Sequence, residues 1–260
     1  MARNLALSRA SSTDANAQMN NENQDINDIA YNAYASWKHW QGEHDLAIMG
    51  ERYAQELQRA GLPLASRILE VGFGNGDFLS WAHQAGYRIT GVEINPAFVE
   101  SARLQGFDVQ QGDIAKLNFG AEKFDAIVAL DVLEHLTKPA ILEHLRTYNN
   151  LLAPHGVVIA RFPNAASPFG IWAQVGDITH QTGLTSDTMV QFGLLSGFTM
   201  IYGGNAARSY RGGKRKGLAI IKRLTYVIRD LMEIFFGYLY FGQRVPLDMN
   251  MTVIMKRIEP

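Results

Sequence analysis

The 260-residue chain contains no cysteine. This absence excludes a disulfide framework, a thiolate zinc or iron–sulfur site and a cysteine nucleophile. Long apolar runs are also missing: residues 188–207 carry no charge but are interrupted by glycines and polar residues, and residues 234–243 are too short. Neither could span a bilayer, which needs about 20 apolar residues. Without a secretory signal pattern, the sequence predicts a cytoplasmic protein, either free or peripheral at the inner membrane surface.

The chain has little net charge because two opposite excesses cancel. Residues 201–260 contain 11 Lys+Arg and four Asp+Glu, whereas residues 1–200 contain 13 Lys+Arg and 21 Asp+Glu. Such asymmetry suggests an anionic partner for the basic segment. Nucleic acid is disfavoured because the rest of the chain is acidic and would repel it.

The organisation predicted from composition is one domain preceded by an arm. Residues 1–28 are polar and aperiodic, which is typical of disorder. The domain is expected to cover residues 29–260, since 47% of the chain is hydrophobic and can form a large core. Residues 29–42 are rich in Tyr and Trp, and they predict either an aromatic lid over a ligand or an ordinary packed helix.

Short apolar runs then alternate with amphipathic segments, which predicts βαβ units and a mostly parallel sheet with helices on both faces. The expected strands are residues 67–71, 87–93, 107–110, 124–130, 156–161, 198–202 and 250–258. The expected helices are residues 43–60, 78–85, 96–105, 138–152, 186–195 and 218–237.

Glycine or a carboxylate follows each of the first four strands. Gly72, Gly74 and Gly76 form a turn after the first strand, and Glu93, Asp113 and Asp131 end the next three. Because the carboxyl ends of parallel strands meet at one edge, where open α/β sheets bind ligands, these residues predict a nucleoside site.

The charges around the glycine turn select the nucleoside. A dinucleotide fingerprint needs a third glycine where this chain has Asp77, and a carboxylate there would repel a diphosphate. Glu70 adds a second negative charge. The two carboxylates favour a ligand that carries positive ammonium and sulfonium groups. S-adenosylmethionine is such a ligand, and NAD is not.

Four motifs together resemble those of class I S-adenosylmethionine-dependent methyltransferases, in the branch of ubiquinone-biosynthesis-type and small-molecule or glycan O-methyltransferases. They are Glu70-x-Gly72-x-Gly74-x-Gly76, Gly91-Val92-Glu93, Gly112-Asp113 and Asp131-Val132-Leu133-Glu134-His135. The resemblance covers about residues 43–202 and resumes at 250–258. It implies an α/β, Rossmann-like fold, with a seven-stranded, mostly parallel sheet whose last strand is antiparallel.

The resemblance also implies a role for each cofactor-binding residue. Glu70 and the glycine turn would hold the methionine end, Glu93 with Ile94 beside it the ribose, Asp113 and Ile114 the adenine, and Leu130 and Asp131 the methionine side. No metal is expected.

His180 is the first candidate for a general base, because it follows the fifth strand on the edge where an acceptor must enter, and Asp177 could orient it. It could equally cap a helix or pack a lid. His135 is more often architectural in the family. Arg161 and Asn164 could bind the acceptor or merely hold a loop.

The predicted reaction is O-methylation of a small molecule, sugar or lipid-linked glycan. The alternatives are N-methylation of an amine or protein side chain, and a non-catalytic cofactor-binding module.

The segment between the last two strands, residues 203–249, departs from a minimal member of the family. Seven cations lie within residues 208–223, and the helix expected after them has one apolar and one charged face. Such a helix could contact a membrane or lipid-linked substrate through residues 208–241. It could instead pack at the acceptor pocket or in a homodimer while its charges stay solvated.

Overall fold

A computed structural model describes residues 46–210 and 216–259. The arm and the aromatic segment expected over residues 1–42 lie outside these ranges. Within them, no helix is both long enough and apolar enough to cross a membrane.

Seven strands form one sheet in the order β3-β2-β1-β4-β5-β7-β6, in which β7 runs antiparallel to both of its neighbours. The remaining pairs are parallel, so the predicted fold class is confirmed. The strands are β1 (Arg67–Val71), β2 (Arg88–Glu93), β3 (Val109–Gln111), β4 (Phe124–Leu130), β5 (Leu152–Pro163), β6 (Phe198–Asn205) and β7 (Asn250–Arg257).

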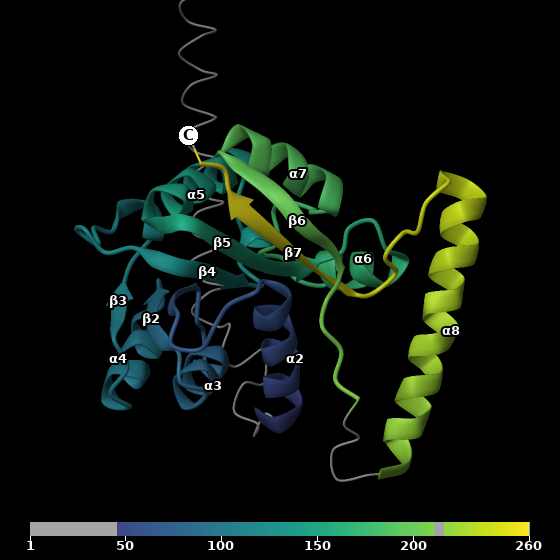
Figure 1. Ribbon diagram of the computed structural model, residues 1–260, viewed down its shortest axis with the longest axis horizontal. Coiled ribbons are helices and arrows are strands. Elements are labelled where there is room, and N and C mark those ends of the chain that lie inside the picture. Colours follow the sequence, from purple (N-terminus) through teal and green to yellow (C-terminus); the bar gives the residue numbers. More distant parts are fainter. Residues whose placement is uncertain (1–45, 211–215, 260) are drawn as a thin grey trace, which may run out of the picture. The chain divides into compact units, whose positions relative to one another are not determined.

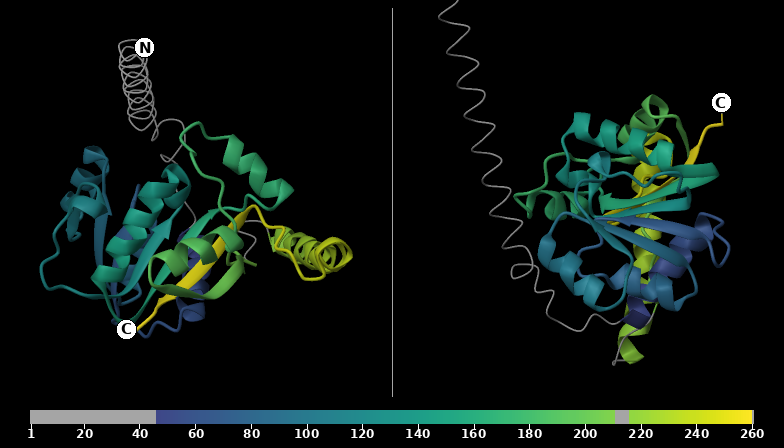
Figure 2. Two further views of the ribbon diagram at one scale, coloured as in Figure 1. Left: turned by 90° about the horizontal axis from the view of Figure 1, so that it is seen from above. Right: turned by 90° about the vertical axis from the view of Figure 1, so that its left-hand side faces the viewer.

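Helices cover both faces of the sheet, as Figures 1 and 2 show. They are α2 (Leu46–Arg59), α3 (Asp77–Gln84), α4 (Pro96–Leu104), α5 (Lys138–Leu151), α6 (Pro168–Val175), α7 (Ser186–Leu195) and α8 (Lys216–Phe241), with short 3₁₀ turns η1 (Ile114–Lys116) and η2 (Leu133–His135). Two helices begin at side-chain caps: Asn95 accepts from the N–H of Ala97 and starts α4, and Thr137 accepts from the N–H of Ala140 and starts α5.

The core has one layer on each face, and β4 contributes to both. Ile127 packs in the layer covered by α5, with Leu145 and Tyr148. Its neighbour Val128 packs in the layer covered by α2 and α3, with Leu57. Because successive side chains point to opposite faces, the middle of a central strand must be apolar on both faces, which explains the apolar run from Ala126 to Leu130 in β4.

Two parts of the fold differ from the sequence-based expectation. Helix α6 was not predicted, although Ser167 caps it and Pro168 stands at its first turn. Helix α8 forms as expected, but its charges are not left in solvent, as one of the alternatives for this helix assumed. Its charged side pairs with Arg208 and Arg244 in the segments that flank it and with Asn205 of β6, and most of its apolar side chains are exposed.

Candidate active site

The glycine turn after β1 has a backbone that only glycine adopts readily. Gly72, Gly74 and Gly76 have φ values of 70°, 52° and 81°, in the left-handed region. A Cβ on Gly72 would also lie 2.6 Å from Cγ2 of Val132. The backbone therefore turns tightly at the carboxyl edge of the sheet, where the predicted cofactor would lie.

Glu93, at the end of β2, holds this turn in place. Its Oε2 accepts from the N–H of Gly74 at 3.0 Å, and its Oε1 accepts from Ile94 and Asn95 at 2.8 and 2.9 Å. The carboxylate is 8% exposed, and each oxygen has lone pairs that can accept further hydrogen bonds. Glu93 is thus a structural clamp as well as the predicted ribose-binding group, and Ile94 beside it is half-exposed.

Glu70 lies beneath the turn and is 3% exposed. Its Oε2 is buried and has no hydrogen-bond partner within the described ranges. Burial raises the pKa of Glu70 well above its ordinary value, the charges of Glu93 and Asp77 raise it further, and Arg161 opposes them. A buried acceptor surrounded by negative charge suits a cationic group, as the ammonium of S-adenosylmethionine would be, so the residues fit this cofactor.

Asp113 follows β3 and is only partly available to a ligand. Its carboxylate accepts from the N–H of Ala115 and lies 3.2 Å from Nε2 of His144. Burial alone would raise its pKa, but the Ala115 N–H and the cations His144 and Lys116 outweigh it and lower the pKa. The Ile114 side chain is buried in the core, so only its backbone could meet an adenine at this edge.

Asp131 directly follows β4 and has a φ of 59°, which is rare for a residue other than glycine. It forms an ion pair with Arg161 of β5. Burial of Arg161 alone would lower its pKa, but Asp131 raises it above its ordinary value. Arg161 is therefore paired with Asp131, one of the predicted cofactor-binding residues. Leu130, which precedes Asp131 in the chain, is partly buried.

His180 lies at the same edge, in the loop between α6 and α7. Its Nδ1 is 3.1 Å from the carbonyl oxygen of Gln174, and its Nε2 is 3.8 Å from Oδ2 of Asp177. Because a carbonyl can only accept, Nδ1 carries a proton, and in the neutral ring Nε2 can accept one. Asp177 lies beside Nε2, from which it can accept only when that nitrogen is protonated, so the Gln174 carbonyl holds the neutral ring. The Gln174 contact was not foreseeable, since no side-chain pattern marks a backbone oxygen.

His135 packs against His180, with ring centroids 4.6 Å apart. Thr179 Oγ1 donates to Asp177 at 2.6 Å and therefore accepts from His135 Nδ1 at 2.8 Å. Ligand atoms of Glu134, His135 and His180 lie within 4.8 Å of one another. Imidazole and carboxylate are metal ligands, so these three residues could hold an ion, which the sequence patterns did not suggest.

The contacts of Asn164 indicate a structural role, not acceptor binding. It is fully buried, its amide nitrogen donates to the carbonyl of Pro246, and its oxygen accepts from Ala166. Both contacts hold the loop after β5.

Comparison with known proteins places this site in a family. A family model described as a methyltransferase domain matches residues 43–199, which include the glycine turn and all four strand ends. The chain belongs to this family. The enzyme is accordingly an S-adenosylmethionine-dependent methyltransferase, and the predicted resemblance and cofactor are confirmed.

Among curated relatives, this methyltransferase is similar to two proteins named ubiquinone biosynthesis O-methyltransferase. It is 30% identical to that of Marinobacter nauticus over 173 residues, 61% of this chain and 71% of the relative. It is 32% identical to that of Histophilus somni over 143 residues, 51% of this chain and 58% of the relative. The match therefore spans little more than half of the Histophilus protein.

Solved structures share the fold. An S-adenosylmethionine-dependent methyltransferase from Archaeoglobus fulgidus aligns with a TM-score of 0.55 at 16% identity, over 81% of this chain and 96% of the other. The N-methyltransferase NodS from Bradyrhizobium japonicum, in complex with S-adenosyl-L-homocysteine, aligns with a TM-score of 0.53 at 17% identity, over 81% and 87%.

Proposed function

We propose that this methyltransferase transfers the methyl group to an oxygen of a small molecule, sugar or lipid-linked glycan. The observation that carries the proposal is His180, whose Nδ1 is bonded to the Gln174 carbonyl while Nε2 can accept a proton. A hydroxyl acceptor needs such a base, whereas a neutral amine needs little help. The O-methyltransferase names of the curated relatives support the same choice.

S-adenosylmethionine, when bound, supplies a methyl group already activated by a positive sulfur. The protein therefore mainly positions the reactants and excludes water. We assign Glu70 to the ammonium of the cofactor, Glu93 and Ile94 to the ribose, and Asp113 with Ile114 to the adenine. The glycine turn, Leu130 and Asp131 would line the methionine side. The Gln174 carbonyl positions His180, which removes the proton of the acceptor hydroxyl through Nε2, and Asp177 would then pair with the imidazolium that forms.

The cofactor assignment is tested by calorimetry with S-adenosylmethionine. Glu93→Ala should weaken binding by about 1.5–3 kcal/mol, because charge-assisted hydrogen bonds are lost. Glu100→Ala, an exposed carboxylate on α4, is the matched control and should bind as the unaltered protein does. Equal affinity in both variants would remove Glu93 from the site.

The base is tested by the pH dependence of turnover, using radiolabelled S-adenosylmethionine and a panel of catechol, sugar and amine acceptors. His180→Gln should lose about 10²–10⁴-fold in rate while cofactor affinity is retained, and exposed His155→Gln should lose nothing. Repeating the assay with EDTA separates the two roles of His180: a loss in EDTA that Mg²⁺ or Zn²⁺ restores would contradict a base.

The same assay tests the alternative functions. A labelled N-methyl product from the amine acceptors alone would contradict O-methylation. Cofactor binding without turnover on any acceptor would favour a non-catalytic module.

A further inference from the structure

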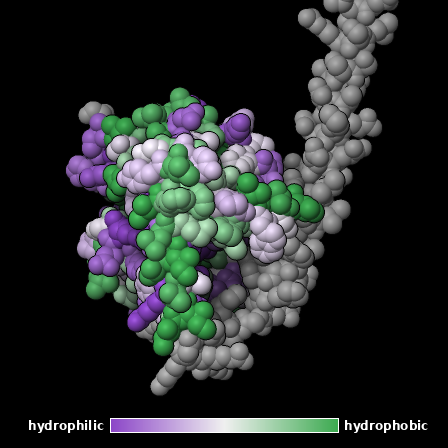
Figure 3. Space-filling model, turned by 90° about the vertical axis from the view of Figure 1, so that its right-hand side faces the viewer, coloured by the Kyte–Doolittle hydropathy of each residue, from purple (hydrophilic) through white to green (hydrophobic). Residues whose placement is uncertain are grey.

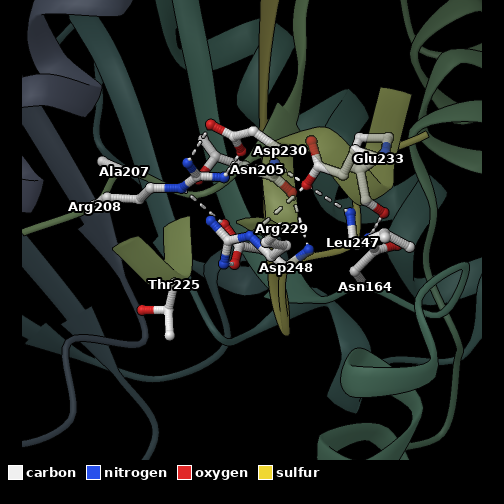
Figure 4. Close-up of polar contacts among 12 residues, drawn as sticks. Asn164, Asn205, Ala207, Arg208, Thr225, Arg229, Asp230, Glu233, Leu247 and Asp248 are labelled. Carbon is white, nitrogen blue, oxygen red and sulfur yellow. Dashed lines mark hydrogen bonds and ion pairs between the residues drawn. The ribbon is translucent and has the colours of Figure 1, made fainter. Parts of the chain in front are cut away.

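The charged side of helix α8 pairs with the segments that flank it and, through Asn205, with the end of β6. Asp230 pairs with Arg208 at 2.7 Å, and Glu233, which is fully buried, pairs with Arg244 at 2.7 Å. Figure 4 shows these side chains converging between the helix and the strands. Ion pairs and hydrogen bonds therefore take the place of the apolar contacts by which an amphipathic helix normally packs on a domain.

The opposite side of α8 is apolar and exposed. Side chains at alternating spacings of three and four residues are each half-exposed or more: Ile221, Leu224, Ile228, Leu231, Phe235 and Tyr238. Figure 3 shows this side of the helix as a continuous hydrophobic stripe. Exposed apolar patches of this extent on a soluble domain mark a surface that contacts a partner or a membrane.

The width of the stripe argues against a second copy of the helix as the partner. In a paired coiled coil, charged residues flank an apolar seam of this spacing. Here the flanking positions are themselves apolar and exposed, including Ile220, Val227 and Ile234 on one side and Leu239 on the other. A broad apolar face opposite a polar one is instead typical of a helix that lies in a membrane interface.

Charge and aromatic residues at the two ends fit the same environment. Apart from the ion-paired Arg208, residues 211–223 contain six cations and no acidic residue, and Arg223 is exposed in the first half of the helix. Tyr240 and Phe241 are 70% and 68% exposed at its end. Cations attract anionic headgroups, and aromatic rings bind at the level of the headgroups.

The exposed apolar surface continues towards the candidate active site. Ser167 Oγ, at the start of α6, donates to the carbonyl of Leu247, just after α8. Trp172 and Val175 of α6 are 71% and 74% exposed. The carbonyl oxygen of Gln174, in the same helix, lies 3.1 Å from Nδ1 of His180. Figures 1 and 2 both show α6 between the sheet and α8.

We propose that the apolar face of α8 binds the surface of an anionic phospholipid bilayer, with Arg223 at the headgroups and α6 facing the same surface. This orientation would present the methyltransferase site to acceptors held in or near the membrane. The surface is separate from the catalytic residues, so the proposal does not depend on whether oxygen is the methylated atom.

The test is flotation of the full chain with vesicles of phosphatidylcholine that contain about 30% phosphatidylglycerol, an anionic lipid that attracts basic segments. The protein should float with these vesicles, and several-fold less should float with pure phosphatidylcholine or in high salt. The double variant I228D/L231D should lose at least about tenfold in vesicle binding, since two charges enter the apolar face.

Two controls keep the result specific. Leu104→Asp changes an 80% exposed leucine on α4 and should float as before. Cofactor affinity and melting temperature of I228D/L231D should stay unchanged, because both side chains are exposed on the side of α8 opposite to Glu233. Absence of flotation on the anionic vesicles, or flotation unaffected by I228D/L231D, would overturn the proposal. If the protein does not float and instead forms a dimer in sedimentation equilibrium that I228D/L231D dissociates, the apolar face binds a second copy and the proposal is also overturned.

Discussion

Glu233 and Glu70 are both buried carboxylates, yet their surroundings are opposite. Glu233 accepts from Asn205 at 2.6 Å and from the N–H of Leu247 at 3.0 Å, and it pairs with Arg244. Glu70 is surrounded by negative charge, and its Oε2 has no partner in the described part of the chain. Buried polar atoms are normally satisfied. A fully satisfied carboxylate therefore holds structure, whereas an unsatisfied one marks a place for a ligand.

The largest expected effect in this comparison is on Glu233. Glu233→Gln keeps the size of the side chain but removes its charge, so the free energy of unfolding should fall by about 1–3 kcal/mol. Urea denaturation measures this loss. The control Glu100→Gln, at an exposed position of α4, should change it little. A stable Glu233→Gln protein would mean that the contacts of α8 contribute little to folding.

Glu70→Gln should have a smaller effect of the opposite sign. Burial, followed by Glu93 and Asp77, raises the pKa of Glu70 above 4.5, so the folded protein binds this proton more tightly than the unfolded chain. Ionising the buried Glu70 destabilises the folded protein. This destabilisation is absent below the unfolded-state pKa of about 4.5 and grows as the pH rises through the folded-state pKa. Without cofactor, Glu70→Gln should therefore stabilise the protein more at pH 8 than at pH 5, in urea denaturation at each pH.

The same variant should weaken S-adenosylmethionine binding, measured by calorimetry, because the carboxylate that would meet the ammonium is gone. Stabilisation without loss of cofactor affinity would contradict the ligand role of Glu70.

The smallest expected effect is on the exposed face of α8. Leu231→Ala should change the free energy of unfolding by less than about 0.5 kcal/mol, because the leucine is 61% exposed. Leu145→Ala, on the buried face of α5, is the matched control and should cost about 2–5 kcal/mol. Thermal or urea denaturation of both variants compares them directly. A large loss in Leu231→Ala would mean that this face is covered in solution.

Much of the fold was predictable because local patterns determine it. The apolar run of β4 requires burial on both faces, and the glycines after β1 require a left-handed turn. Helix α6 was missed because residues 168–175 are too uniformly apolar to show a helical period. Its only signal was the capping pair Ser167 and Pro168.

The missing details of the site and of α8 depend on contacts distant in sequence. The residues at the sheet edge could be predicted, since parallel strands bring their ends together. The bond between Asp113 and His144, or the anchoring of Asp230 by Arg208, could not. The sequence likewise showed that α8 has two faces, but the choice of the buried face depends on Asn205, Arg208 and Asp248, which lie outside the helix.

The hairpin of β6 and β7 has a consequence for how such a protein can diversify. Asn205, the last residue of β6, is paired in register with Met251 at the start of β7. The chain thus leaves and re-enters the sheet at one place, and everything in residues 206–249 is an excursion from a hairpin. Loop closure becomes only slowly more costly with loop length. Whole helices can therefore be exchanged here as modules, with the catalytic scaffold left intact.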